Sequence, residues 1–145
     1  MIRSKDNGMG RFSVEIEVAN NDDVARARAG DIPEAQVRRA RVRGVVDRGA
    51  TRLVLPASVV RELGATITGQ VGVRCADGSV ADRDRADGIF LTCLGRSSVF
   101  NAVVEPDRDS ALIGAIVLED LDLIVNCTTQ QLTPRDPKRI ISEAE

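Results

Sequence analysis

The sequence predicts a mostly β fold: a small, partly closed β-barrel with a hairpin and one short helix near the C-terminus. Runs of alternating apolar and polar residues recur along the chain, as expected for half-buried strands. Turn-forming Gly, Asp and Asn residues separate these runs, and a stretch late in the chain takes helical spacing. With 145 residues the chain has the size of one domain. We expect a polar N-terminal tail at 1–10, the domain at 11–135 and a C-terminal tail at 136–145.

The first third of the chain is predicted to form two strands joined by a helical connection. Residues 11–18 (RFSVEIEV) alternate apolar and polar side chains, which is typical of a strand with one buried face. Residues 20–22 offer a cap for a short helix or helical loop that would end near Gly30. The strand pattern returns from 37 to 47. Its first half carries four arginines, which we interpret as the solvated side of the strand rather than a nucleic-acid contact: Arg38, Arg39, Arg41 and Arg43.

The middle of the chain is predicted to contain a short helix and a hairpin. After the apolar run LVLP (53–56), the segment ASVVRELG presents one short apolar face and ends at Gly64. The segment VGVRCADGSVADRD then looks like a hairpin, because alternating valines lead into a tight Ala-Asp-Gly-Ser tip and a polar return arm. The tip comprises Ala76, Asp77, Gly78 and Ser79.

The last third is predicted to contain four strands and one helix. GIFLTCLG (88–95) and SVFNAVVE (98–105) form two strands around a Gly-Arg-Ser-Ser turn. The segment 111–123 begins apolar and continues with helical spacing. LIVNC and QQLTP then form a final hairpin around a Thr-Thr-Gln connection.

The composition excludes several functional classes. The chain has no histidine, which removes Ser-His and Cys-His nucleophilic pairs, His-ligated zinc and imidazole catalysis. Aromatic residues make up 2% and the net charge is −2, so neither a base-stacking platform nor a phosphate-binding surface is expected. The three cysteines, Cys75, Cys93 and Cys127, are widely spaced, and we interpret them as small buried apolar residues of a cytoplasmic protein. We expect no metal, no cofactor, no nucleic-acid partner and no membrane association.

The segment VVDRGAT (45–51) carries the most specific pattern in the chain. A β-branched pair leads directly into Asp47, followed by Arg48, Gly49 and Ala50. Taken alone, Asp-x-Gly is also typical of an ordinary strand-end aspartate that caps a turn. With histidine absent, carboxylates are the natural candidates for any hydrolytic chemistry.

The order of features over residues 11–134 resembles the retropepsin-like aspartic proteases, most closely the bacterial members with one Asp motif per chain. The resemblance rests on the Asp-x-Gly-Ala motif followed by LVLP and a short helix, and on the CADGSV hairpin at the place of that family's flap. It also rests on the two paired strands that follow, and on Leu112-Ile113-Gly114 before a helix.

The resemblance implies a homodimeric aspartic endopeptidase in which two copies of Asp47 share one proton and activate water. It implies that Gly49 allows a close turn, that residues 76–79 form a flap over an extended peptide, and that residues 112–114 support the active-site turn from the core. No cofactor or metal is required for this chemistry.

The chain departs from the family pattern at Arg48, where the family has Thr or Ser. That hydroxyl bonds to the partner loop in the family, and an arginine cannot replace it. If Arg48 points inward, it brings like charges together or favours the ionised form of both aspartates; if it extends outward, the dimer is loosened. The alternative is therefore a weakened or inactive retropepsin-fold module that binds extended peptides or serves as a structural dimer. A third option is a small β domain in which Asp-x-Gly is coincidental.

Overall fold

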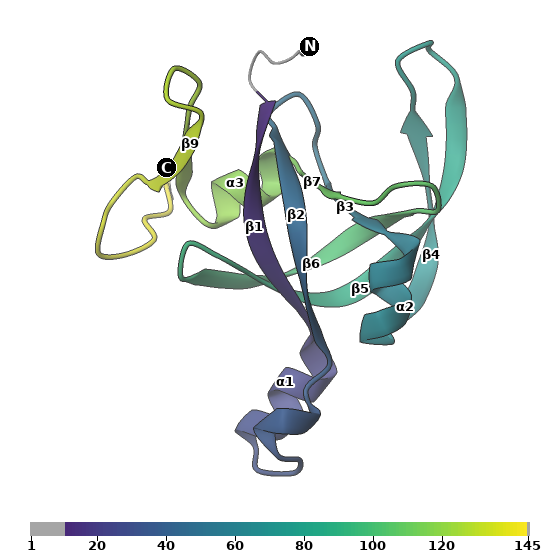
Figure 1. The fold of residues 1–145 in the computed structure, drawn as a ribbon, viewed down its shortest axis with the longest axis vertical. Helices are drawn as coiled ribbons and strands as arrows, with labels where there is room; N and C mark the ends of the chain where they lie inside the picture. Colours follow the sequence, from purple (N-terminus) through teal and green to yellow (C-terminus); the bar gives the residue numbers. More distant parts are fainter. Residues whose placement is uncertain (1–10, 145) are drawn as a thin grey trace.

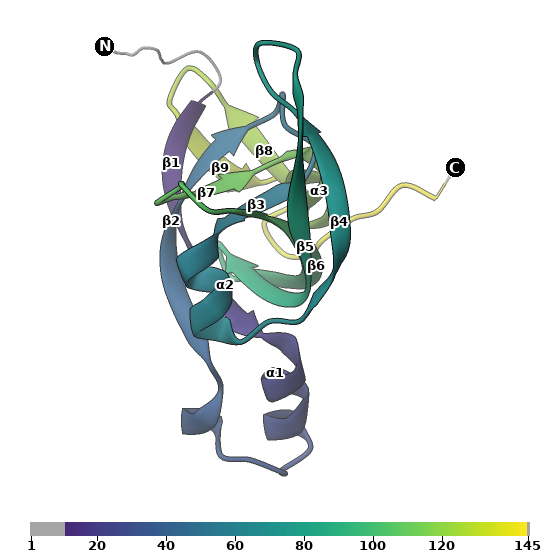
Figure 2. The same ribbon diagram turned by 90° about the vertical axis from the view of Figure 1, so that its right-hand side faces the viewer.

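The computed structural model describes residues 11–144 as a β-rich domain with a helix at one end and a long hairpin at the other (Figures 1 and 2). The predicted N-terminal tail, 1–10, lies outside the described residues. The elements of the described part are β1 (Arg11–Asn20), α1 (Asn21–Arg28), the 3-10 helix η1 (Glu34–Gln36), β2 (Arg39–Asp47), β3 (Leu53–Pro56), α2 (Ala57–Leu63), β4 (Ile67–Arg74), β5 (Val80–Cys93), β6 (Arg96–Glu105), β7 (Ala111–Ile113), α3 (Ala115–Asp120), β8 (Leu123–Asn126) and β9 (Gln131–Pro134).

A closed barrel of six strands forms the centre of the domain. The strands pair in the order β1-β2-β7-β3-β6-β5, and a further pairing of β1 with β5 closes the ring. β2 and β7 are parallel, as are β3 and β6, so the barrel is mixed. Strands account for 49% of the structure and helices for 18%, which confirms the mostly β prediction. The predicted partial closure is complete in the structure because Glu17–Asn20 pairs with Ile89–Thr92.

The barrel interior is the hydrophobic core. Alternate residues of each strand point inward, as the period of two requires. Ile16, Val46, Leu55, Leu91 and Ile113 are each at most 1% exposed. The core therefore lies directly beneath the ends of β2 and β7, which fixes the positions of the loops that leave those strands.

The helical connection between β1 and β2 is anchored by polar contacts. Asn20 caps α1, because its Oδ1 accepts a hydrogen bond from the Asp23 amide at 3.1 Å. Its Nδ2 donates to the Leu63 carbonyl at 2.9 Å, which joins this end to the last turn of α2. Asp23 in turn binds the Arg38 guanidinium at 2.8 Å and the Arg38 amide at 3.0 Å. Arg38 is thus a structural partner, in contrast to the prediction of a purely solvated arginine run.

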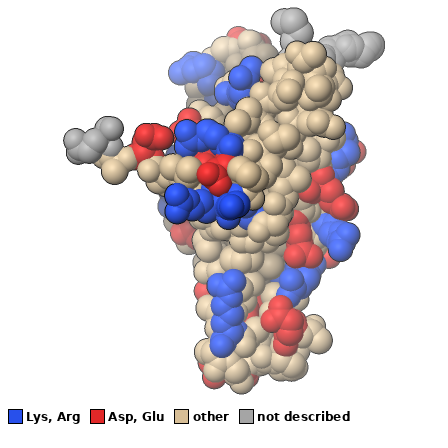
Figure 3. All heavy atoms as spheres, turned by 90° about the vertical axis from the view of Figure 1, so that its left-hand side faces the viewer, with Lys and Arg blue, Asp and Glu red and all other residues tan. Residues whose placement is uncertain are grey.

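The other three arginines of that run lie on the solvated face of the β1–β2 pair. Arg39 lies 3.6 Å from Glu17, Arg41 lies 3.8 Å from Glu15, and Arg43 donates to the Ser13 hydroxyl at 2.9 Å. Each arginine thus has a polar neighbour on the adjacent strand. The face in Figure 3 likewise mixes basic and acidic side chains and has no extended surface of a single sign.

β5 differs from its prediction in length. The expected polar return arm and the expected strand 88–95 form one continuous strand of 14 residues. Its register with β6 shifts between Ala86 and Ile89, and Gly88 there has φ of +69°. Such a bulge bends a strand. One half of β5 therefore pairs with β4 in the protruding hairpin, while the other half belongs to the barrel.

The late helix is shorter than the apolar spacing predicted. α3 ends at Asp120, and Leu123 already belongs to β8. Asp122 has φ of +57°, a left-handed conformation that ends helices. The stretch of apolar residues continues past this point because the strand that follows also packs its side chains against the core.

The three cysteines differ in burial. Cys93 is 2% exposed, and burial raises the pKa of its thiol to about 11, so it is an uncharged core residue as predicted. Cys75 and Cys127 are exposed, which corrects the expectation that all three are buried. All three are free thiols.

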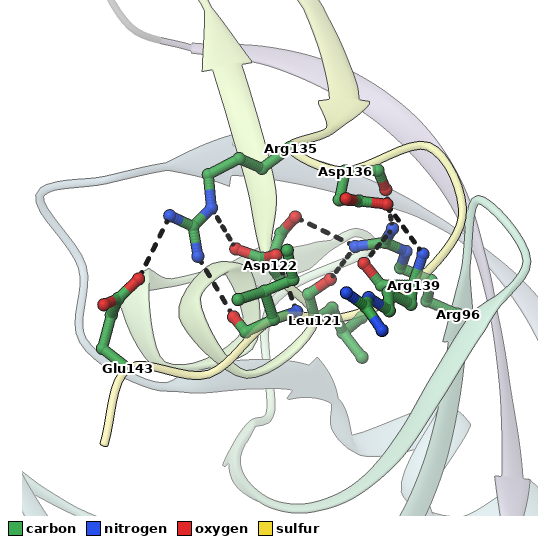
Figure 4. Close-up of polar contacts among 8 residues, drawn as sticks. Arg96, Leu121, Asp122, Arg135, Asp136, Arg139 and Glu143 are labelled. Carbon is green, nitrogen blue, oxygen red and sulfur yellow. Dashed lines mark hydrogen bonds and ion pairs between the residues drawn. The ribbon is translucent and has the colours of Figure 1, made fainter. Parts of the chain in front are cut away.

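Residues 135–144 form no helix or strand, but they are held against the domain by polar contacts (Figure 4). Arg96, at the start of β6, donates to the carbonyls of Leu121 and Asp122 and also to those of Asp136 and Arg139. Asp122 accepts from the Arg135 guanidinium at 2.7 Å and from the Ile141 amide at 3.0 Å. The predicted tail at 136–145 thus packs onto the α3–β8 corner over its described residues.

Within residues 11–144, none of the helices has the length and apolar character needed to cross a membrane. The same residues contain no cluster of three or more acidic or cysteine side chains arranged to hold a metal ion.

Candidate active site

Asp47 is the last residue of β2, and its carboxylate is fixed by the turn that it begins. Asp47 Oδ1 accepts a hydrogen bond from the Gly49 amide at 2.9 Å, and its carbonyl accepts from the Ala50 amide at 3.1 Å. A Cβ at Gly49 would lie only 3.2 Å from Asp47 Oδ1, so a larger residue there would displace the carboxylate. The Asp47 side chain is 15% exposed and therefore remains accessible from solvent.

Arg11 lies directly opposite Asp47 across the β1–β2 pair. The two residues are register partners, so their side chains leave the sheet on the same face. Arg11 Nη2 lies 2.9 Å from Asp47 Oδ2. In the single chain, one carboxylate oxygen thus contacts a backbone amide and the other contacts a guanidinium.

The start of α3 supports the Asp47 turn through backbone contacts. The amides of Ala115 and Ile116 donate to the carbonyls of Ala50 and Thr51, at 2.8 and 3.0 Å respectively. Gly114 lies so close to the turn that a Cβ would approach the Thr51 carbonyl carbon and the Arg52 carbonyl oxygen to 2.6 Å. A glycine is therefore needed at this position for steric reasons.

Residues 112–114 divide between the core and the surface of the site. Ile113 is 1% exposed and packs into the barrel, whereas Leu112 is partly exposed and faces the cleft described below. This division follows from the alternation of side chains along a strand. Of the three residues, Ile113 packs in the core, Leu112 lines the site and Gly114 contacts the turn.

A cleft of about 740 Å³ lies between the Asp47 turn and the β4–β5 hairpin. Its lining comes from the turn, from the inner part of the hairpin and from the barrel: Arg11, Asp47, Gly49, Ala50, Thr51, Arg52, Val54, Val71, Gly72, Val73, Arg74, Val103 and Leu112. Asp47 is the one carboxylate among these residues. The cleft has the size of ordinary ligand sites.

The hairpin tip at 76–79 is exposed and does not line this cleft. Asp77 Oδ1 accepts from the Ser79 amide at 2.9 Å and from its hydroxyl at 2.6 Å, while Gly78 has φ of +87°. These contacts give the tip a defined turn. The hairpin residues that face Asp47 are 71–74, which lie earlier along β4 than the sequence indicated.

Arg48 points away from Asp47. Its side chain is exposed, and Nη2 donates to Cys127 Sγ at 3.3 Å, in the turn between β8 and β9. Arg48 also lines a second cavity of about 680 Å³, beside α3 and β8. The sequence allowed either an inward or an outward Arg48 side chain, and the structure has the outward one. The cation that contacts Asp47 is instead Arg11.

No family model matches the sequence, and no match is found among curated proteins. Among solved structures, the EIAV protease complexed with the inhibitor HBY-793 matches 83% of this chain and 94% of its own, with a TM-score of 0.55 and 15% identity. This chain has the retropepsin-like fold. The simian foamy virus (mac) protease matches 74% of this chain and 91% of its own, with 13% identity and a TM-score of 0.47.

The sequence predicted a site at the Asp47 turn but did not indicate several other residues that line the same cleft. Arg11 could have been found by aligning the two predicted strands as an antiparallel pair, since Arg11 at the start of β1 lies opposite Asp47 at the end of β2. Arg52 and Arg74 gave no such signal, because Arg52 lies in the loop before β3, Arg74 ends β4, and both border the cleft only through tertiary packing.

Proposed function

We propose that the protein is a homodimeric aspartic endopeptidase, in which Asp47 from each of two chains forms the catalytic pair. The observation that carries this proposal is the setting of Asp47. It is the one carboxylate lining a cleft beneath a hairpin, and its turn is fixed by backbone hydrogen bonds. The retropepsin-like fold supports the proposal, because such a chain supplies half of a two-aspartate site.

The chemistry follows from two carboxylates that share one proton. Carboxylates about 3 Å apart do not both ionise readily, so one remains protonated. The ionised Asp47 takes a proton from a water molecule whose oxygen attacks the scissile carbonyl carbon. The protonated Asp47 donates to the carbonyl oxygen. The C–N bond then breaks, and the leaving nitrogen receives a proton from the pair. Residues 71–74 of the hairpin cover the peptide and limit access of bulk water.

The position of Arg48 favours activity over the inactive alternative. Because Arg48 contacts Cys127, its charge is directed away from the carboxylate. In the dimer it replaces a hydroxyl that the family uses between the two turns, so we expect the dimer to be weaker than in the family.

The test is cleavage of an unbiased peptide pool from about pH 4 to about pH 7. The chain as written would be compared with Asp47→Asn and Arg48→Thr, and each variant would be examined by sedimentation. We expect cleavage by the chain as written, a loss of at least about a thousandfold in Asp47→Asn, and tighter dimers in Arg48→Thr. Dimers that cleave nothing, with or without Arg48, would contradict the proposal.

A second candidate function is a peptide-binding module without catalysis. The Arg11–Asp47 ion pair favours it, because this contact occupies the carboxylate oxygen not bound by Gly49. This candidate predicts that Asp47→Asn retains full peptide binding and that neither Arg48→Thr nor Arg11→Gln produces cleavage.

A further inference from the structure

The charge of the cleft differs in sign from that of the whole protein. Its lining has three arginines and one carboxylate, whereas the chain carries a net charge of −2. Asp47 is already paired with Arg11. The remaining two arginines, Arg52 and Arg74, therefore give the cleft its positive charge.

Neither of these two arginines contacts a carboxylate within residues 11–144. Arg52 Nη1 donates to the side-chain oxygen of Asn101 at 3.1 Å. Arg74 Nη1 donates to the Gly78 carbonyl at 3.2 Å. Both partners are neutral, so they orient the guanidinium groups without neutralising them. Asn101 and Gly78 lie outside the lining of the cleft, so the two guanidinium groups are held at its rim, and Arg52 also borders a second pocket that contains Asp120.

Some arginines elsewhere on the surface are paired with carboxylates. Arg83 binds Glu105 at 2.8 Å, Arg39 binds Glu34 at 2.8 Å, and Arg135 binds Asp122 at 2.7 Å. Others, such as Arg43 and Arg96, contact neutral oxygens instead. Arg52 and Arg74 belong to this second group and border the same cleft, and a low-dielectric cleft wall strengthens the attraction of such charges for anionic groups.

The rest of the wall is aliphatic. It is formed by partly or fully buried side chains of the barrel and the hairpin: Val54, Val71, Val73, Val103 and Leu112. The lining contains no aromatic residue. The cleft therefore combines an apolar surface for aliphatic side chains with cationic groups on either side, one from the turn and one from the hairpin.

We propose that the cleft selects extended peptides that carry Asp or Glu near an aliphatic segment, with Arg52 and Arg74 binding the acidic side chains. This inference rests on the proposed function for the position of the scissile bond, but peptide binding itself does not require catalysis. Arg52 and Arg74 would thus determine which peptides bind, whereas Asp47 is the proposed catalytic residue.

The experiment measures binding separately from cleavage. The probes are fluorescein-labelled decapeptides with a central Val-Leu pair and Gln at the flanking positions, together with relatives in which Glu replaces Gln at one position on each side. Their Kd is measured by anisotropy for Asp47→Asn combined with Arg11→Gln, because Arg11 would otherwise lose its carboxylate partner and become a third free cation in the cleft. The same measurement is made with Arg52→Gln, with Arg74→Gln, or with both added. Arg61→Gln is the matched control, because Arg61 is exposed on α2 and does not line the cleft.

We expect the best Glu peptide to bind about three- to tenfold more tightly than the Gln peptide for each arginine engaged. The preference is expected to fall from about 0.05 to about 0.5 M NaCl. The double Arg variant should abolish the preference, and Arg61→Gln should retain it. Equal binding of both peptides, binding of neither, or a preference that survives in the double variant would overturn the inference.

Cleavage of the same peptides by the chain as written reports on the proposed function alone. A binding preference without cleavage would support the acidic-peptide site and contradict the peptidase. Cleavage with equal rates for Glu and Gln peptides would support the peptidase and contradict the preference.

Discussion

Arg11 and Asp47 are register partners at the open end of the β1–β2 pair, and an ion pair of 2.9 Å joins their side chains. The contact holds the proposed catalytic carboxylate in the single chain. The proposed catalytic pair requires the second carboxylate and a water molecule to reach Asp47, whereas Arg11 already occupies its Oδ2 oxygen. The two arrangements therefore compete.

We predict that Arg11→Gln increases peptide cleavage by about three- to tenfold near pH 6, because it frees Asp47 Oδ2 for the second carboxylate and the water molecule. The ion pair is largely exposed on the Arg11 side, so the free energy of unfolding should change by less than about 1 kcal/mol. The measurements are kcat/KM and urea unfolding. Arg43→Gln is the control, since Arg43 lies on the same pair of strands and binds only the Ser13 hydroxyl among the described residues. Lower activity in Arg11→Gln would mean that Arg11 assists the reaction.

Gly114→Ala is predicted to destabilise the protein and to disturb the Asp47 turn. The added Cβ would lie 2.6 Å from the backbone of Thr51 and Arg52, and backbone atoms yield less easily than the end of a side chain. We expect a loss of about 1–3 kcal/mol in urea unfolding. Gly69→Ala is the control, because its Cβ would meet only the end of Arg85 at 3.7 Å. Equal stability of the two variants would contradict the close packing of α3 against the turn.

The Asp23–Arg38 contact predicts a specific loss of stability in acid. The hydrogen bonds from Arg38 lower the pKa of Asp23 to about 2. Because this folded-state value is below the unfolded value of about 3.9, the contact stabilises the protein fully above about pH 4. The contribution disappears as the pH falls from about 4 to about 2.

We expect this contact to contribute roughly 1–2 kcal/mol, since Arg38 itself is half exposed. Urea unfolding of the native chain and of Asp23→Asn at several pH values measures it. The two free energies should differ at neutral pH and converge near pH 2. A difference that persists unchanged in acid would show that Asp23 acts through packing rather than charge.

Asp122→Asn is predicted to release residues 135–144 from the α3–β8 corner. Asp122 accepts hydrogen bonds from Ile141 and Arg135, and these contacts lower the pKa of its carboxyl. Attachment should therefore be firm at neutral pH and weaken as the pH falls below the ordinary carboxyl range. Limited trypsin digestion after Lys138 and Arg139 should become about three- to tenfold faster in the variant.

The control for tail release is Asp120→Asn. Asp120 is the exposed last residue of α3, two positions before Asp122, so its replacement should leave the digestion rate unchanged. Equal rates for Asp122→Asn and the native chain would show that the Arg96 contacts suffice to hold the segment.

Local patterns predicted most of the fold. Strand alternation identified the β1–β2 pair, the apolar helix face and Gly64 identified α2, and the tight tip identified the hairpin. These three patterns can be recognised in a sequence because each depends on residues that are close together along the chain. The closure of the barrel had no such signal, because Glu17 and Thr92 meet only through the tertiary structure. The sequence did not indicate the bulge at Gly88 either, so the prediction divided β5 into a hairpin arm and a separate strand.

Part of the lining of the cleft was predicted from the sequence. Asp47, Gly49 and Ala50 form a contiguous motif and lie together in the cleft. The hairpin was expected to contribute its tip, yet its residues 71–74 line the cleft, because the tip extends beyond the turn. The orientation of Arg48 could not be read from the sequence, since it depends on Cys127, which is 79 positions away.

The pairing that closes the barrel also sets an order of events during synthesis. β1 leaves the ribosome before its partner in β5, which follows about 75 residues later. At roughly 5–20 residues per second, β1 waits about 4–15 s for that partner, and β2 waits longer for β7, so both edges of the nascent β1–β2 pair are unpaired. Exposed strand edges invite association with other chains, and charged side chains oppose it. The alternating Glu and Arg side chains of this hairpin would thus protect the nascent chain before they serve the folded protein.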